Sequence, residues 1–410
     1  MSGDVQPAVY SSTTSRTYML VTSLASGDVL VLETDTLQTR RTFTTPRDIQ
    51  NETMVHCAVA SHSGDVMIRK DTHVSFSAWD LVTGTCIQHF ASDLPGFGEI
   101  GPLTLTHDGT RAATAHRSRA SVGMCIVVTW DVASGDVLHL FENYVNLPMA
   151  LSFSPNKSFL VCTDAGGECS EFCSTGALFI TRNVRSEGAP ENEMRAVVWE
   201  PDSNKYICGH VDGSVITVES AGSTLQVQAD LTPAPLSYFA YSSRGDSVAA
   251  LAMSVDGSLL AIAGGRLIDE CDDKSTGKSR VSGFVSVYQT SNVGGNTQVS
   301  RDWYKHLLWK YSAIPEHHGS VFSVSFSLDS KLLASGGIDR ICRVWNALDG
   351  IIVDQINMSH FINDLFFVFD IEEQRNRRLA FAMGGHESLG IDSILSVLPT
   401  DLMDKLIDSI

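Results

Sequence analysis

The sequence predicts an all-β fold built from a repeated unit of four short strands. Short apolar runs alternate with turns throughout the chain, and one unit reads VFSVSFS from residue 321, then KLLASGG, ICRVW and IIVDQI. The same order of runs recurs both upstream and downstream of this unit. Most ends of the third strands are about 40 to 57 residues apart, which is the period expected of four-stranded repeats with variable loops.

Eight copies of the unit fit the chain, and we expect them to form one domain over residues 1–398. Their expected positions are residues 5–43, 53–90, 101–141, 148–182, 194–229, 247–310, 320–356 and 361–398. Seven units are the alternative, because the C-terminal copy can supply the first inner strand if residues 5–10 do not form one. A polar insertion at 266–281 lengthens the sixth copy, and the apolar spacing at 399–410 predicts a short C-terminal amphipathic helix.

The charge and the apolar runs limit the classes of partner. The formal net charge is −18, whereas recognition of phosphate groups needs a basic surface. No apolar run reaches the roughly 18 residues that span a bilayer. We therefore expect protein partners, and no direct contact with nucleic acid, membrane or a small-molecule substrate.

The cysteines and the N-terminal residues indicate the compartment. Nine cysteines are scattered along the chain without the regular spacing of a disulfide framework, and residues 1–12 do not have the pattern of a secretion signal. Reduced thiols are typical of the cytoplasm, which we expect as the location, with the nucleus as the alternative.

Three dipeptides at the ends of third strands suggest a family. Trp79-Asp80 and Trp130-Asp131 occupy this position in two copies, and Trp345-Asn346 occupies it in the copy at 317–356. The chain resembles the WD40-repeat β-propeller family over essentially its whole length. The resemblance implies a closed eight-bladed propeller, with seven blades as the alternative, because a ring of radially packed blades hides every sheet face.

The resemblance also implies a structural hydrogen-bond network in the best copy. Its members would be His317, Ser335, Asp339 and Trp345, and the chemistry fits because a buried indole N–H needs an acceptor. Other copies depart from the pattern. Val218 replaces the Trp in the copy at 194–229, and Ser26 replaces the Asp in the first copy. We expect those blades to be held by strand pairing and apolar packing alone.

Partners of the resembled family usually meet the face formed by loops into the first strand and between the second and third strands. The residues of this sequence at those positions, and therefore the expected protein-binding residues, are His210, His317, Ser320, Ile338 and Arg340.

A search for catalytic, cofactor and metal sites gives no candidate that we retain. Residues 277–279 read Gly-Lys-Ser, but the glycine that a phosphate loop needs five residues earlier is missing. The acidic string at 269–273 does not have the spacing of a calcium loop. Cys162, Cys169 and Cys173 have no fourth zinc ligand nearby, so buried thiols are the preferred interpretation.

The function expected from the sequence is a non-catalytic scaffold or adaptor subunit of a multiprotein complex. One alternative is a substrate- or peptide-recognition module, such as a ubiquitin-ligase receptor. A more specific alternative is the WD-repeat adaptor of a superkiller-type RNA-exosome helicase complex, which the chain resembles in its loop layout. The insertion at 266–281 is either a partner-binding loop or a tolerated surface insertion.

Overall fold

The protein is described from a computed structural model. It describes residues 17–23, 28–34, 36–44, 58–61, 65–91, 97–118, 125–144, 146–173, 178–184, 193–202, 204–220, 237–239, 246–268, 280–290, 307–312 and 319–369. This part of the chain contains strands and no helix. The helix expected at 399–410 lies outside it and gains no support. No helix within the described ranges could cross a membrane.

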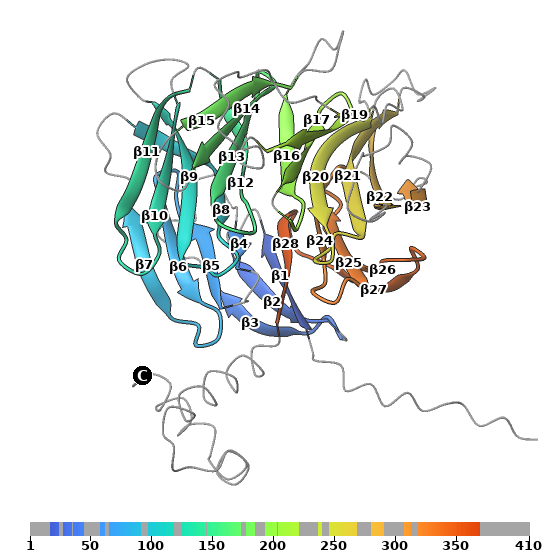
Figure 1. The fold of residues 1–410 in the computed structure, drawn as a ribbon. Coiled ribbons are helices and arrows are strands. Elements are labelled where there is room, and N and C mark those ends of the chain that lie inside the picture. Colours follow the sequence, from blue (N-terminus) through green and yellow to red (C-terminus); the bar gives the residue numbers. More distant parts are fainter. Residues whose placement is uncertain are drawn as a thin grey trace, which may run out of the picture.

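The strands form seven antiparallel sheets of four strands each, arranged around a centre (Figure 1). From the innermost strand outwards, the first sheets are β28 (Ile362–Phe369), β1 (Thr17–Ser23), β2 (Val29–Glu33) and β3 (Thr39–Phe43); β4 (Ala58–Ala60), β5 (Val66–Lys70), β6 (Ser75–Asp80) and β7 (Cys86–Ala91); β8 (Phe97–Leu105), β9 (Arg111–Ser118), β10 (Cys125–Asp131) and β11 (Val137–Tyr144); and β12 (Pro148–Phe153), β13 (Phe159–Asp164), β14 (Glu168–Cys173) and β15 (Leu178–Asn183).

The other three sheets follow the same order. They are β16 (Met194–Trp199), β17 (Lys205–His210), β18 (Val215–Glu219) and β19 (Ser237–Phe239); β20 (Asp246–Met253), β21 (Leu259–Ile268), β22 (Arg280–Gln289) and β23 (Leu307–Ser312); and β24 (Val321–Phe326), β25 (Leu332–Gly337), β26 (Ile341–Asn346) and β27 (Ile352–Asn357).

Burial along the strands explains their composition. In β13, with the sequence FLVCTD, every residue is buried, because this second strand is covered by a neighbouring sheet on both faces. In the outermost strand β27, IVDQIN, no residue is fully buried. β-branched and aromatic residues fill the buried strands, as expected for pleated surfaces that pack against each other.

The ring is closed by packing at each junction between sheets. The innermost strands contact each other in the order β28, β4, β8, β12, β16, β20, β24 and back to β28. Seven apolar clusters of buried residues lie between the sheets, one at each junction. Each sheet therefore buries both faces against its two neighbours.

The expectation of eight blades is wrong, because the two ends of the repeat region share one sheet. β28 pairs with β1, with Thr17 opposite Phe369 and Leu20 opposite Phe366 (Figure 1). The segment expected as a separate unit at 361–398 thus contributes the innermost strand of the sheet that contains β1 to β3. Residues 5–10, which were expected to form that strand, lie outside the described residues.

Two element positions differ from the sequence expectation. The fourth strand of the copy expected at 194–229 is β19, at Ser237–Phe239. The expected insertion at 266–281 is partly strand, since Arg266 pairs with Ser282 and Ile268 with Arg280. The β21–β22 hairpin is therefore longer than its counterparts in the other sheets, and residues 269–279 lie outside the described part.

The ring has two faces that differ in their turns. We call the face with the turns between first and second strands the AB face, and the opposite face, with the turns between second and third strands, the BC face. On the BC side, the first strands β12, β16, β20 and β24 each begin with a register shift. Backbones come close there, and a Cβ added to Gly264 or Gly337 would overlap the carbonyl oxygen of Ser247 or Ser320, respectively.

Candidate functional site

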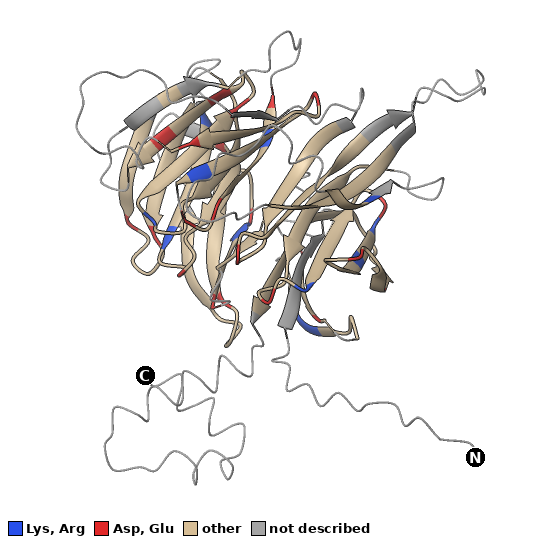
Figure 2. Cartoon of the chain, turned by 45° about the vertical axis from the view of Figure 1, so that its right-hand side comes forward, with Lys and Arg blue, Asp and Glu red and all other residues tan. Residues whose placement is uncertain are grey.

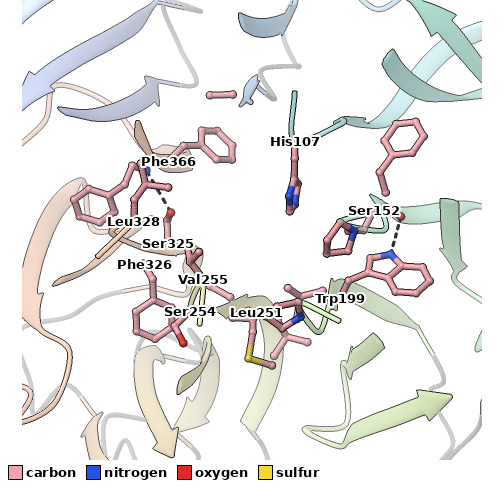
Figure 3. A pocket seen from close by; sticks show the side chains of 18 of the residues that line it. His107, Ser152, Trp199, Leu251, Ser254, Val255, Ser325, Phe326, Leu328 and Phe366 are labelled. Atoms are coloured by element: carbon pink, nitrogen blue, oxygen red, sulfur yellow. Dashed lines mark hydrogen bonds between the residues drawn. The ribbon is translucent and has the colours of Figure 1, made fainter. Parts of the chain in front are cut away.

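A cavity of about 620 Å³ lies at the AB face, where the innermost strands of the ring end. The strand ends contribute large apolar side chains, among them Trp199, Met253, Phe326 and Phe366. Figure 3 shows that these side chains come from several sheets and surround a common space. Cavities of this size and apolar character are typical of binding sites.

Five similar turns form the mouth of this cavity. The turns begin at Thr106, Ser154, Glu200, Ser254 and Ser327, and in each the first residue donates its N–H to the carbonyl five residues later. The second residues of these turns all line the cavity. They are His107, Pro155, Pro201, Val255 and Leu328. Four of these five side chains are apolar, so the repeat places an apolar ring around the opening.

The third residues of the same turns, each next in sequence to a residue that lines the cavity, have acidic or amide side chains. They are Asp108, Asn156, Asp202, Asp256 and Asp329. In four turns the buried hydroxyl of the first residue donates to the third residue, for example Ser254 Oγ to Asp256 Oδ1 at 2.6 Å and Ser327 Oγ to Asp329 Oδ1 at 2.6 Å. These bonds fix the carboxylates in place. We call Asp108, Asp202, Asp256 and Asp329 the acidic rim.

Hydrogen bonds keep three rim carboxylates ionised. Partial burial acts to raise the pKa of Asp108, but bonds from Lys157, Thr106 and Thr110 outweigh it and hold that pKa well below its ordinary value. The pKa values of Asp256 and Asp329 are also lowered. Burial acts to raise them, but hydrogen bonds from hydroxyl and backbone donors outweigh this effect. These three carboxylates are therefore ionised at neutral pH, and Lys157 and Lys331 offset the charges of Asp108 and Asp329, respectively.

His107 is the one titratable side chain among the described residues that line the cavity. Burial is the largest cause of its shift and lowers its pKa below the ordinary value, an effect that Asp108 partly opposes. The imidazole is therefore neutral near pH 7. The cavity lining offers apolar contact area, with a negative charge at its border.

Two rim turns have a non-glycine residue in the left-handed backbone region. Lys157 and Ser330 both have φ of 60°, at the turn position where Gly109 and Gly257 have φ of 71°. Both side chains reach the preceding turn: Lys157 pairs with Asp108, and Ser330 Oγ lies 3.4 Å from Asp256 Oδ1. Side chains in this backbone region are unfavourable, so each turn carries some strain.

The residues expected to bind partners lie on the BC face, and three of them are brought together. Ile338 donates its N–H to the carbonyl of Ser320 at 3.0 Å. The guanidinium of Arg340, which is exposed, lies over the ring of Phe361, 5.3 Å from its centroid. His317 falls outside the described residues.

His210, which was also expected to contact a partner, is buried. Its side chain has no solvent exposure, and it lies at the end of β17 in a different sheet from Ser320, Ile338 and Arg340. It therefore belongs to the interior of the ring.

The residues expected to form a network in the copy at 317–356 extend from the β25–β26 turn, which holds Asp339, along β26 to Trp345. Trp345 Nε1 donates to Ser335 Oγ at 2.8 Å, and both residues are buried. Asp339 Oδ2 accepts a hydrogen bond from Arg343 Nη1 at 2.7 Å, with only 7% of either side chain exposed. The arginine partner was not expected from the sequence, although its four-residue spacing from Asp339 is visible there.

Two other sheets build related networks with different side chains. Trp130 Nε1 donates to Thr114 Oγ1, which lies 2.8 Å from His116 Nε2. Because the Thr114 hydroxyl accepts from the indole, its own proton is available to His116. In the sheet of β4 to β7, Trp79 Nε1 donates to Ser77 Oγ, and Ser77 donates to Asp71.

The sheet of β16 to β19 has a polar junction that the sequence did not reveal. Glu171 in β14 is fully buried, and its carboxylate accepts hydrogen bonds from Tyr206 Oη at 3.0 Å and Ser220 Oγ at 3.0 Å. The expectation that this sheet is held by strand pairing and apolar packing alone is therefore wrong. A buried carboxylate bound by two hydroxyls takes the place of the tryptophan network.

Cys162 and Cys169 are buried in apolar surroundings. Cys162 and Cys169 belong to different apolar clusters, on opposite faces of one sheet. Cys169 Sγ lies 3.5 Å from Cys208 Sγ of the next sheet, and burial, followed by the nearby Cys208, raises the pKa of Cys169 well above its ordinary value. Within the described residues, no group of three His, Cys, Asp or Glu side chains is placed to hold a metal ion.

Basic side chains give the described part of the ring no continuous positive surface. Figure 2 shows Lys and Arg residues scattered over several sheets, with Asp and Glu residues interspersed. Two lysines stand near the acidic rim, and each is bound to a rim aspartate: Lys157 to Asp108, and Lys331 to Asp329 at 3.5 Å.

Comparison with known proteins agrees with the fold. Residues 309–346 match the family model "WD domain, G-beta repeat". The chain is similar to the crystal structure of the Cps50 (Swd1) beta-propeller domain from Myceliophteria thermophila, with a TM-score of 0.53 and 13% sequence identity. That similarity covers 73% of this chain and 86% of the other. A search of curated protein sequences finds no match.

Proposed function

We propose that this chain, which folds as a β-propeller and matches the WD40-repeat model over residues 309–346, acts as a non-catalytic protein-interaction scaffold in a multiprotein complex. The observation that carries the proposal is that the polar side chains that form the buried networks lie inside the ring and not in the cavity. The buried networks brace a single sheet, as between Trp345 and Ser335, or join two sheets, as between Glu171 and Tyr206, while the cavity at the AB face is lined mainly by apolar side chains. Such a surface suits the binding of another protein, since catalysis needs convergent acid, base or nucleophilic groups.

The long β21–β22 hairpin supports a second contact surface. Its strands pair for two residues beyond Arg266, which is itself opposite Asp246 of the first strand. Loops on a rigid scaffold commonly carry recognition, so we propose that the hairpin and its connection at 269–279 contribute an interface. We also propose a cytoplasmic location, with the nucleus as the alternative.

Affinity purification from the native cell, followed by mass spectrometry, tests the scaffold. Intact protein should retain partners in stoichiometric amounts. A variant that joins Ile268 to Arg280 through a two-residue turn should lose the partners that bind this hairpin. The matched control replaces residues 269–279 with a Gly-Ser linker of equal length. A protein that purifies alone as a monomer would contradict the scaffold function.

A peptide-recognition module is a second candidate, and the apolar cavity with its acidic rim favours it. The two candidates differ in what is recognised, because a scaffold holds folded subunits and a recognition module holds short segments. The WD-repeat adaptor of a superkiller-type helicase complex stays one specific form of the scaffold, and the partners identified by mass spectrometry decide it.

A further inference from the structure

The AB-face cavity combines two features: a lining to which all seven sheets contribute, apolar except for His107 and a few serines, and aspartates in the turns that form its mouth. We propose that this cavity binds an extended segment of a partner protein, which inserts one large apolar side chain and carries Lys or Arg residues on both sides of it. The proposal rests on the proposed scaffold function and names the chemistry of one partner.

Several apolar side chains that line the cavity are incompletely buried. Val255 at the mouth is 47% exposed, and Met253, Leu328 and Phe366 are only partly buried. Comparable side chains at the junctions between sheets, such as Val287 and Leu333, have no exposure. An inserted leucine, methionine or phenylalanine would remove this remaining apolar surface from water, which is favourable in proportion to the area covered.

The carboxylates of the acidic rim are held in fixed orientations. Asp202, Asp256 and Asp329 are exposed, and they are held by donors within their own turns rather than free to rotate. A cation that approaches the rim therefore meets oriented carboxylates, which reduces the entropy cost of forming the pair. The net charge of −18 adds long-range attraction for a basic segment.

The chain's own C-terminal residues are the competing occupant, because they continue from the same face. β28 ends at Phe369, opposite Thr17, and Phe366 and Phe367 of this strand line the cavity. The terminal sequence LPTDLMDKLIDSI offers apolar side chains, but it carries three aspartates and one lysine. Like charges at the acidic rim disfavour this segment, and a partner segment with basic residues is favoured.

A phage library of random 16-residue peptides, panned against the full-length protein, tests the proposal. Enriched peptides should share a large apolar residue with Lys or Arg on both sides. The binding of one synthetic enriched peptide would then be measured by fluorescence anisotropy. Val255→Lys should weaken it about tenfold or more, which corresponds to the loss of one buried apolar contact and the gain of a like charge. Asp256→Asn should weaken it by a few fold and reduce its dependence on salt.

Matched controls separate the cavity from the rest of the surface. Val353→Lys changes an exposed valine of β27, and Asp349→Asn changes an exposed aspartate of the turn before β27. Both controls should bind the peptide as the unmodified protein does, and thermal melting should show all four variants folded.

Three results would overturn the proposal. The first is the absence of a shared basic and apolar pattern among the enriched peptides, and the second is equal binding to Val255→Lys. The third is binding that appears only after removal of residues 399–410, which would assign the cavity to the chain's own segment. If native partners still co-purify with Val255→Lys, the scaffold function stands and only this inference fails.

Discussion

On the BC face, polar side chains at the strand ends are buried and bound to one another, whereas on the AB face similar side chains are exposed and cap their own turns. Asp339 and Arg343 represent the first arrangement, with 7% exposure each. Asp256 and Ser254 represent the second, with an exposed carboxylate. Polar residues of the BC side therefore brace the strands of their own sheet, while those of the AB side are exposed to a partner.

We expect the largest effect on stability from substituting the buried Asp339, in comparison with the exposed Asp256. Asp339→Ala leaves the buried guanidinium of Arg343 without its carboxylate, so we expect a loss of about 3 kcal/mol in the free energy of unfolding. Asp256→Ala removes only a turn cap on the exposed face, and should cost less than about 1 kcal/mol. Urea unfolding of both variants measures the difference. Equal losses would show that the BC face has no special role in stability.

The next largest effect on stability is expected from replacing Gly337 by alanine, in comparison with Gly257, because the added methyl group meets different atoms at the two positions. A Cβ at Gly337 would overlap the carbonyl oxygen of Ser320 and lie 2.8 Å from Val321 Cα, so Gly337→Ala must shift the backbone. We expect a loss of about 2–3 kcal/mol. At Gly257 the φ of 71° is the main obstacle, and the nearest atoms belong to Pro201 at 3.1 Å. Gly257→Ala should therefore cost about 1 kcal/mol, and a reversed order of melting temperatures would refute the comparison.

Much of this architecture follows from the sequence, because the repeat period and the alternation of apolar runs locate most strands. The number of blades does not follow from it. Whether a terminal segment forms its own sheet or completes a distant one depends on the pairing of β1 with β28, across almost the whole chain. The repeat pattern allows this pairing, which was the alternative to a separate eighth unit, but it does not select between the two.

The site was only partly predictable for a similar reason. The Ser335–Trp345 pair follows from the repeat motif, whereas Glu171 stands in a strand with the sequence ECSEFC and finds its two partners 35 and 49 residues away. The cavity mouth was visible in retrospect. THDGT, SPNKS, EPDSN, SVDGS and SLDSK share the same turn pattern, and comparing their second residues would have revealed the apolar ring.

The third effect concerns pH and again distinguishes the two faces. Burial, with a further contribution from Lys70, lowers the pKa of His116 from 6.5 to about 4. The unfolded chain therefore binds a proton that the folded chain does not, and stability falls as the pH drops from about 6.5 towards 4. We expect the unmodified protein to lose roughly 2 kcal/mol more than His116→Gln between pH 7 and pH 5.

The acidic rim supplies the control for that measurement. Asp108 has a lowered pKa, so its contribution is present above the ordinary carboxyl value and is lost only as the pH falls below it. Asp108→Asn should therefore keep the same slope between pH 7 and pH 5 as the unmodified protein. A flattened slope in Asp108→Asn, or an unchanged one in His116→Gln, would contradict the assignment of this part of the pH dependence to His116.

The smallest effect tests whether the strained turns of the AB face are kept for their side chains. Ser330→Gly relieves a φ of 60° and gives up a long contact of 3.4 Å with Asp256, so we expect a gain of roughly 0.5 kcal/mol. Lys157→Gly relieves the same strain but breaks the ion pair with Asp108, and the two changes should nearly cancel. The melting temperatures of Ser330→Gly and Lys157→Gly, each compared with that of the unmodified protein, test these expectations. If Ser330→Gly is destabilising, its hydroxyl holds the neighbouring turn, and the acidic rim is a connected unit rather than a set of independent carboxylates.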